Sequence, residues 1–290
     1  MGAMSDEIQT ITEAEQNYPK LLHEIAQPPA QLYIRGTLPS GPTLAVVGTR
    51  LPTAYGKQIT PGLVLELAQA GFVIISGLAY GIDVMAHTAA LDAGGTTIAV
   101  LGTGVDENSL YPRKHIKLAR RIIASGGAVI SEYEPGTAGR KHHFPARNRI
   151  VSGMSLGTVV IEAKQKSGAL ITSKHALDQN RDVFAVPGPI SSAESVGPNQ
   201  LIAAGATPVL SPNTILEFYG QTAPLFAKSA EENATTEEKR VLDALTQSAL
   251  HVDVIAETLS LPANKTLALL TQLELRGLIG NVGGGTYSRT

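Results

Sequence analysis

The stretch of the sequence with the most chemistry in it is residues 139–150, GRKHHFPARNRI. It brings together four Lys and Arg residues, two His residues and one Phe, and the only acids between Arg113 and Arg149 are Glu132 and Glu134. Cations that follow a phosphate backbone, beside an aromatic ring that stacks on a base, are typical of a site for single-stranded nucleic acid. The stretch therefore predicts such a site, with core packing as the alternative role of Phe144.

The neighbouring histidines, His142 and His143, raise the question of a metal site. No carboxylate or thiol stands at ligand spacing from them, so we expect no metal and no cofactor. The chain has no cysteine, which excludes disulfides, thiolate metal sites and a cysteine nucleophile. In the same stretch, Asn148 and Arg149 have bracing of the loop as an alternative role.

Two turns, Gly48-Thr49-Arg50 and Ser76-Gly77, each follow an apolar run. Glycine lets a backbone approach a ligand closely, a hydroxyl can donate to an oxygen, and an arginine can bind a phosphate through two N–H groups. We expect phosphate binding here, with a plain tight turn as the alternative. The pattern G-x-G-x-x-G is absent from the first turn, which argues against a dinucleotide.

Other polar features have weaker claims to a function. Asp83 stands at a helix start, where a carboxylate caps N–H groups, so we expect a structural role. The basic run from Arg113 to Arg121 fits a helix that binds nucleic acid, and its alternative role is the solvated face of a helix. Glu162 could act as an acid in the cleavage of a glycosidic bond, but no second carboxylate pairs with it at a readable spacing, which favours a buried brace.

These features need a framework, and the apolar runs between them indicate one. Runs that are apolar throughout are typical of parallel strands covered on both faces. They predict strands at 44–47, 72–75, 97–101, 128–130, 158–161, 183–186 and 208–210, with helices near 58–70, 82–93, 112–124, 169–179 and 199–204. The expected fold is α/β: a doubly wound, mostly parallel Rossmann-like sheet with a small C-terminal winged-helix domain. The carboxyl ends of parallel strands meet at one edge of a sheet, so the turns at Gly48-Thr49-Arg50 and Ser76-Gly77 are expected to lie together at that edge.

The expected domains follow changes in composition. Residues 5–43, with a helical candidate at Ile11–Ala26 and a strand-like Leu32–Ile34, form a short N-terminal extension packing on the core. Residues 44–220 form the Rossmann-like single-stranded-DNA-binding domain, and residues 221–236, small and polar, form a linker.

Residues 237–290 are expected to form a winged-helix-like domain. Helix-patterned runs at 238–247, 252–259 and 264–276 precede a hairpin around Gly283-Gly284-Gly285.

Composition narrows the class of protein. At 290 residues the chain can bury a large core and still form a second small domain. Its formal net charge is −2, so a nucleic-acid site must be a local basic patch. No apolar run is long enough to cross a bilayer and no signal pattern is present, so we expect a soluble, cytoplasmic protein.

In order and spacing, several motifs resemble those of the DNA-processing protein A family. They are VVGTR, SGLAYGID, IAVLGTGVD followed by YP, SEYEPG, HFPARNRIVSG, KSGALIT and DVFAVPG, within about Tyr18 to Gly220. The tail is similar to the winged-helix module that many members carry. The resemblance implies a non-enzymatic homodimer that binds single-stranded DNA without sequence preference, protects incoming DNA, and loads the RecA recombinase in natural transformation and recombination.

The resemblance also implies roles for individual residues. The nucleic-acid contacts, from the first-loop arginine to the R-N-R signature, fall on Arg50, Ser76, Gly77, Lys141, Phe144, Arg147, Asn148 and Arg149. The dimer contacts of the family fall near Leu201, Ile202 and Val209.

The C-terminal module has an unusual charge for a DNA reader. From Ala230 onward there are eight acidic and five basic residues, and the recognition helix offers only Lys265 and Arg276. A winged helix that reads DNA should be basic where it enters the groove. We therefore expect this module to bind protein rather than DNA.

Two alternative functions belong to other classes. The first is a nucleotide N-glycosidase (phosphoribohydrolase) of a related Rossmann family, suggested by Glu162 and the glycine loops; Gly157-Thr158 fits its pattern, but the preceding PGG does not occur. The second is a winged-helix transcription regulator with a ligand-sensing Rossmann domain, which the acidic tail opposes.

Overall fold

The computed structural model describes residues 7–221, 235–245, 249–259, 261–275 and 278–289. The chain divides into two compact units, Met1–Ala223 and Pro224–Thr290. Most of the expected linker, and Arg276 of the expected recognition helix, lie outside the described residues. Within the described ranges, none of the helices is long and apolar enough to span a membrane.

The larger unit is built on a nine-stranded sheet with the strand order β1-β2-β6-β5-β4-β3-β7-β8-β9. The strands from β3 to β9 are parallel, whereas β2 runs antiparallel to β6 and β1 antiparallel to β2. The expected mostly parallel α/β fold is therefore confirmed. The bounds are β1 Gln9–Thr12, β2 Gln31–Gly36, β3 Thr43–Val47, β4 Val73–Ser76, β5 Thr97–Val100, β6 Ala128–Ser131, β7 Gly157–Val160, β8 Asp182–Ala185 and β9 Thr207–Pro208.

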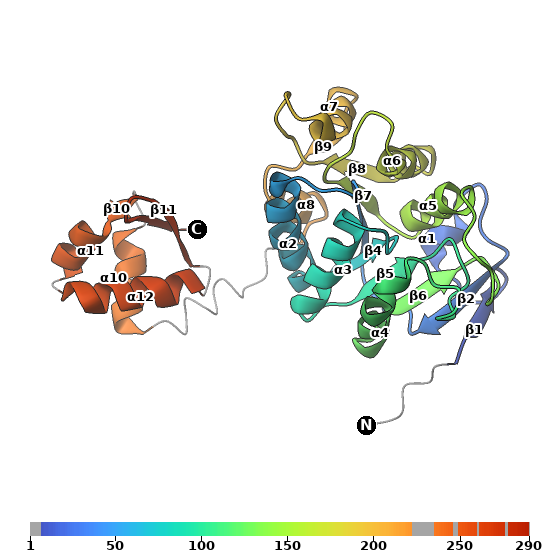
Figure 1. Ribbon diagram of the computed structural model, residues 1–290, viewed down its shortest axis with the longest axis horizontal. Coiled ribbons are helices and arrows are strands. Elements are labelled where there is room, and N and C mark those ends of the chain that lie inside the picture. The colour runs from blue at the N-terminus through green and yellow to red at the C-terminus, as the bar shows by residue number, and fades with distance from the viewer. Residues whose placement is uncertain (1–6, 222–234, 246–248, 260, 276–277, 290) are drawn as a thin grey trace. The chain divides into compact units, whose positions relative to one another are not determined.

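Helices cover both faces of this sheet (Figure 1). On one face α2 packs against α3 and α8, and α3 against α4; on the other, α5 packs against α6 and α1. The bounds are α1 Lys20–His23, α2 Ala54–Gln69, α3 Ile82–Asp92, α4 Ile116–Ala124, α5 His143–Gly153, α6 Gly168–Asp178, α7 Val196–Ala203 and α8 Pro212–Phe218, with short 3₁₀ turns η1 Arg113–His115 and η2 Ala193–Ser195.

Strand β3 is apolar from Leu44 to Val47 because both of its faces are covered. Leu44 and Val46 belong to the core on the α2–α3 face, and Ala45 and Val47 belong to the core on the opposite face. Because successive side chains of a strand point to opposite faces, a strand covered on both sides needs apolar residues at every position.

The N-terminal segment differs from expectation. A helix at Ile11–Ala26 is wrong: the segment forms β1 and only the single turn α1. In β1 only Ile11 is buried, and its neighbours are exposed. This pattern is typical of an edge strand that has one face against the core. Since β2 pairs with β6, this segment extends the sheet itself.

The basic stretch at 139–150 is largely helical, where the sequence indicated a loop. Helix α5 begins at His143 and carries Phe144 and Pro145 in its first turn. Proline is tolerated there because the first N–H groups of a helix have no intrahelical partner. A helix imposes a spacing of three and four on the residues that share a face, and this decides which of them meet a ligand.

In its described residues, the smaller unit combines the helices α10, α11 and α12 with an antiparallel three-stranded sheet of order β10-β12-β11. A capping box between Thr235 and Glu238 begins its first helix. Gly283, Gly284 and Gly285 all have positive φ, which is what a tight hairpin turn requires. The bounds are α10 Thr236–Ala244, β10 Leu250–His251, α11 Val252–Leu259, α12 Ala263–Leu275, β11 Ile279–Gly283 and β12 Thr286–Arg289.

Candidate nucleic-acid interface

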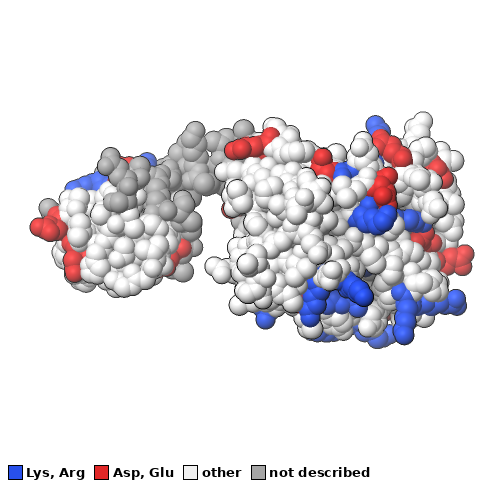
Figure 2. Space-filling model, turned by 90° about the horizontal axis from the view of Figure 1, so that it is seen from above, with Lys and Arg blue, Asp and Glu red and all other residues white. Residues whose placement is uncertain are grey.

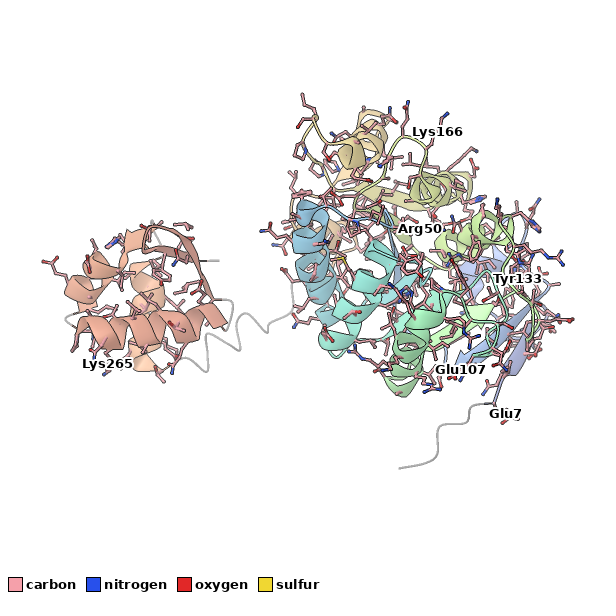
Figure 3. All side chains as sticks on the ribbon, viewed as in Figure 1. Glu7, Arg50, Glu107, Tyr133, Lys166 and Lys265 are labelled. Atoms are coloured by element: carbon pink, nitrogen blue, oxygen red, sulfur yellow. The ribbon has the colours of Figure 1, made fainter. Side chains whose placement is uncertain are left out.

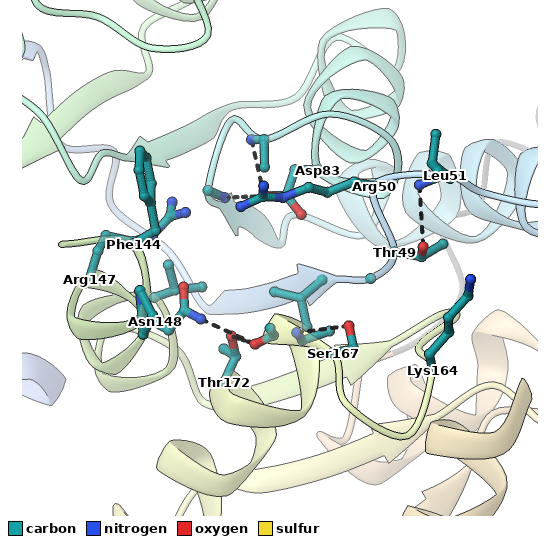
Figure 4. Close-up of a pocket in the computed structure, with 18 of the residues that line it drawn as sticks. Thr49, Arg50, Leu51, Asp83, Phe144, Arg147, Asn148, Lys164, Ser167 and Thr172 are labelled. Carbon is teal, nitrogen blue, oxygen red and sulfur yellow. Dashed lines mark hydrogen bonds between the residues drawn. The ribbon is translucent and has the colours of Figure 1, made fainter. Parts of the chain in front are cut away.

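A pocket of about 700 Å³ opens at the carboxyl ends of the central strands. Its lining comes from the loops that follow β3, β4, β5, β6 and β7, from α5 and from the start of α6 (Figure 4). The chain passes from β3 to β4, β5 and β6 on one side of the sheet and returns to β7, β8 and β9 on the other. Ligands of open α/β sheets bind at this reversal of strand order.

Exposed cations surround the pocket. Arg50, Lys141, Lys164 and Lys166 are all exposed and all belong to its lining. In Figure 3, Arg50 lies between Lys166 on the α6 side and Tyr133 on the β6 side. Lys and Arg side chains also gather along one edge of the larger unit in Figure 2, where acidic side chains are few. The pocket therefore lies in a local basic patch of a chain whose net charge is −2.

Helix α5 presents three of the predicted residues to the pocket. Phe144, Arg147 and Asn148, at spacings of three and four, all line it. The Phe144 ring is tilted against the ring of Tyr111, with centroids 5.8 Å apart, and Tyr111 is exposed. Asn148 donates from Nδ2 to the carbonyl oxygen of Gly168, 3.2 Å away, which ties α5 to the start of α6.

Arg149, the next residue of α5, faces away from the pocket. Its guanidinium forms an ion pair of 2.6 Å with Glu132, and both side chains are mostly buried. Helical spacing thus divides the R-N-R signature, and Arg149 takes the bracing role that the sequence left as an alternative.

Arg147 forms part of the pocket floor and is 5% exposed. Its Nη1 donates to the carbonyl oxygen of Val100. Burial, and to a smaller extent the charge of Arg50, lower the pKa of Arg147 to about 10, against the opposing effect of Asp83. A Cβ on Gly77 would overlap the guanidinium, so Gly77 allows this close packing. A direct contact of Arg147 with a ligand would involve only a small part of its surface.

The side chains of Asp83 and Ser76 form hydrogen bonds with backbone groups around the loop that follows β4. The Asp83 carboxylate accepts from the N–H groups of Gly77 and Ala79, at 3.1 and 3.2 Å, and burial raises its pKa. It therefore caps N–H groups of the preceding loop. The Ser76 side chain is fully buried and donates to the carbonyl oxygen of Val46, at 2.7 Å. The expected ligand contact of the Ser76 hydroxyl is thus wrong, because that hydroxyl lies in the core.

Glu162 is a buried brace, as its sequence context favoured. It is 1% exposed and accepts hydrogen bonds from the backbone N–H and the hydroxyl of Thr53, which begins helix α2. A Cβ on Gly56 would overlap its carboxylate. Glu162 lies outside the pocket lining, so the acid that suggested the glycosidase alternative is not where a ligand would bind.

Several lining residues were missing from the predicted site. Lys164, Lys166 and Ser167 follow β7 as Arg50 follows β3, and this repeated strand–loop–helix pattern could have indicated them. Tyr111 stands in the loop after β5. Glu194 belongs to η2, far along the chain, and no motif pointed to it.

The residues expected at a dimer surface lie at the far edge of the sheet. Leu201 and Ile202, near the end of α7, are partly exposed. Val209 is 6% exposed and packs in the core beside Ile215 and Leu216. Its side chain is therefore unavailable to a second chain, and that part of the expectation is wrong.

Comparison with known proteins identifies a family whose models match both units of the chain. The family model for DNA recombination-mediator protein A matches residues 9–220, and the model for the DprA winged helix domain matches residues 226–285. This confirms the expected winged helix. The chain is 45% identical over 213 residues to the DNA processing protein DprA of Bacillus subtilis, covering 72% of this chain and 71% of that protein. It is 39% identical over 278 residues to the protein Smf of Escherichia coli, covering 92% and 74%.

Two solved structures resemble the larger unit. The DNA processing protein A of Streptococcus pneumoniae has a TM-score of 0.67 at 40% identity, over 73% of this chain and 74% of that one. The protein of the same name from Helicobacter pylori, whose structure concerns its single-stranded DNA binding mode, has a TM-score of 0.65 at 33% identity, over 74% of this chain and 98% of that one.

Proposed function

Because the chain belongs to the DNA recombination-mediator protein A family, we propose that it binds single-stranded DNA in the pocket at the strand ends, without catalysing a reaction on it. The observation that carries this proposal is the combination in one pocket of four exposed cations with the ring pair of Phe144 and Tyr111. Cations bind successive phosphates and exposed rings stack on unpaired bases, which is the chemistry of single-strand binding. The relative from Helicobacter pylori, whose structure concerns single-stranded DNA binding, supports the same choice.

We further propose that the bound strand is protected and passed to the RecA recombinase during natural transformation and recombination. Support for this step comes from family membership. A homodimer would use the edge of the sheet near Leu201 and Ile202, where both side chains are partly exposed.

The winged-helix unit is proposed to bind protein. Among its described residues, Lys265 of α12 already forms an ion pair of 2.6 Å with Glu237 of α10. A lysine engaged within its own unit is less available to a DNA phosphate.

The test is a gel-shift comparison of single-stranded and duplex DNA, with and without the recombinase. We expect tight binding to the single strand, weak binding to the duplex, and faster recombinase filament formation on strands that carry the protein. Arg50→Ala and Lys141→Glu should weaken single-strand binding, whereas Lys57→Glu, an exposed position on α2 outside the pocket lining, should not. Equal affinity for both DNA forms, or unchanged binding by the two pocket variants, would contradict the proposal. Release of a free base from nucleoside monophosphates, abolished by Glu162→Ala, would instead support the enzyme alternative.

A further inference from the structure

Two exposed lysines, Lys114 and Lys117, lie just outside the lining of the pocket. Lys114 belongs to η1, and Lys117 belongs to the first turn of α4. Neither lines the pocket, whereas Tyr111, three residues before Lys114, does. Both lysines belong to the basic run for which the sequence left two roles open, nucleic-acid binding and the solvated face of a helix.

Contacts with the loop after β4 hold Lys114 beside the pocket. Ala79 of this loop lines the pocket, and Tyr80 is the next residue. The Nζ of Lys114 lies over the Tyr80 ring, 4.4 Å from its centroid. The buried His115 places its Nδ1 2.8 Å from the carbonyl oxygen of Leu78, which joins η1 to the same loop. The ammonium of Lys114 is therefore positioned next to the rim of the pocket.

The acidic residues that pair with this basic run bind its arginines. Glu107 forms an ion pair of 2.7 Å with Arg120, and Asp92 forms one of 2.9 Å with Arg121. Among the residues that the structure describes, no carboxylate lies within ion-pair distance of the two lysines. The end of the run is thus neutralised within the protein, and its lysines keep their charge available.

The position of these two charges is unfavourable for the protein alone. The first turns of η1 and α4 carry no acidic residue. The N-terminus of a helix has a positive partial charge, so cations there lower its stability. Like charges at a spacing of three also repel each other. A bound anion would offset both effects, and the contact with the Tyr80 ring leaves N–H donors of Lys114 free to bind one.

The anion that fits this place is the backbone of the strand in the pocket. Lys114 and then Lys117 lead away from the rim along α4, which packs beside α3 on one face of the sheet (Figure 1). A strand longer than the pocket has to leave over its rim. The loop after β6 also reaches the pocket, but it carries the exposed Glu134, which repels a phosphate.

We propose that the strand leaves the pocket over η1 and continues along the start of α4, where Lys114 and Lys117 each bind a phosphate. The proposal rests on the proposed function and extends its site beyond the pocket. Both contacts are with the backbone, so binding stays independent of sequence, as the family resemblance implies.

The test compares dT strands of five and of twenty nucleotides by fluorescence anisotropy. The five-nucleotide strand has four phosphodiesters, as many as the exposed cations of the pocket, and the longer strand reaches past the rim. Each phosphate contact adds about −0.7 to the slope of log K against log salt, which is about 5-fold in affinity at about 0.1 M salt. The wild-type slope should therefore be steeper by about 1.4 for the longer strand.

The double variant Lys114→Gln/Lys117→Gln removes both charges and keeps the helix propensity. It should bind the longer strand about 25-fold more weakly at about 0.1 M salt and the short strand within about 2-fold of the wild type. Lys114→Arg/Lys117→Arg keeps the charges and should retain binding of the longer strand.

The matched control is Lys20→Gln/Lys57→Gln, at two exposed positions outside the pocket lining. It changes net charge equally and should bind both strands as the wild type does. A melting curve of each variant checks its folding.

The proposal is overturned if the folded Lys114→Gln/Lys117→Gln protein binds the longer strand within about 3-fold of the wild type, because the lysines would then be left for an acidic protein or for solvent. It is also overturned if the control loses as much affinity, since net charge alone would explain the effect. Binding of the short strand, weakened by Arg50→Ala, tests the proposed function separately. If neither strand binds the wild type, the proposed function fails and the extended site fails with it.

Discussion

The guanidinium of Arg147 joins the loops at the floor of the pocket. It donates to the carbonyl oxygen of Val100 at the end of β5 and packs against Gly77 after β4. Asp83 of α3 holds the same β4 loop through the N–H groups of Gly77 and Ala79. Both charged groups are buried, so each stabilises the other against the cost of leaving water. Arg147 therefore ties the loops after β4 and β5 together at the pocket floor, and we expect it to affect strand binding chiefly through their positions.

Phe144 is expected to contribute through stacking. Phe144→Ala should weaken binding of a dT strand by about 1–3 kcal/mol, or roughly 5- to 150-fold, the range measured when a stacking ring is removed. Phe144→Trp keeps an aromatic face and should retain most of the affinity. Isothermal titration of both variants checks this. Equal affinity of Phe144→Ala and the wild type would assign Phe144 to packing against Tyr111 alone.

His87 makes the stability of the larger unit depend on pH. Its Nδ1 lies 2.7 Å from the hydroxyl of Thr97, which itself donates to the carbonyl oxygen of Ile74. Because the Thr97 oxygen must then accept from Nδ1–H, the proton of the neutral ring is on Nδ1 and Nε2 is unprotonated. Burial, with the charge of Arg147 and a contribution from His115, lowers the pKa of His87 to about 3. The unfolded chain binds this proton near pH 6.5 and the folded chain does not, so stability is lost as the pH falls below about 6.5.

The expected loss for His87 is at most about 1.4 kcal/mol per pH unit. Urea unfolding of the wild type and His87→Asn between pH 7 and pH 4 measures it. The variant keeps a polar group near Thr97 but cannot titrate, so its stability should fall less steeply with decreasing pH. Parallel slopes for the two proteins would show that His87 is not the source.

At the scale of elements, the turn after β4 shows how close packing limits the sequence. Gly77→Ala places a methyl group on the Arg147 guanidinium and should destabilise the fold by about 1–3 kcal/mol. Gly62→Ala, at an exposed position in α2 with open space around it, is the matched control and should stabilise by about 0.5–1 kcal/mol. Thermal melts compare them. A neutral Gly77→Ala would show that the guanidinium moves without cost.

The parallel strands and the helices between them could be predicted because each strand needs apolar residues on both faces. Edge strand β1 could not, since its one buried residue, Ile11, gives too little pattern to separate a strand from a helix. Helix α5 was missed because basic residues and Pro145 obscure its apolar positions. The strand-end loops could be assigned to the site. The burial of Ser76, at the end of β4, and of Arg147, in α5, could not, because it is decided by packing that the sequence does not display. Glu194 is brought to the pocket by tertiary structure alone.

At the scale of the whole molecule, the two units have separate cores and differ in charge. The larger unit holds the basic pocket, and the module from residue 230 onward has more acidic than basic residues. Deleting residues 230–290 should therefore change the affinity for a dT strand by less than about 2-fold, because an acidic module adds little phosphate binding. A gel shift of the shortened chain measures this. A loss of 10-fold or more would mean that the winged helix binds DNA directly.

The central claim is that exposed cations of the pocket bind the backbone of a single strand, and the salt dependence of binding tests it most directly. Each phosphate contact with a single strand contributes about −0.7 to the slope of log K against log salt, so contacts from Arg50, Lys141, Lys164 and Lys166 predict a slope of about −3. Arg50→Ala should reduce it to about −2 while weakening binding at every salt concentration. A wild-type affinity that does not change with salt, or an Arg50→Ala protein with the wild-type slope and affinity, would contradict the account.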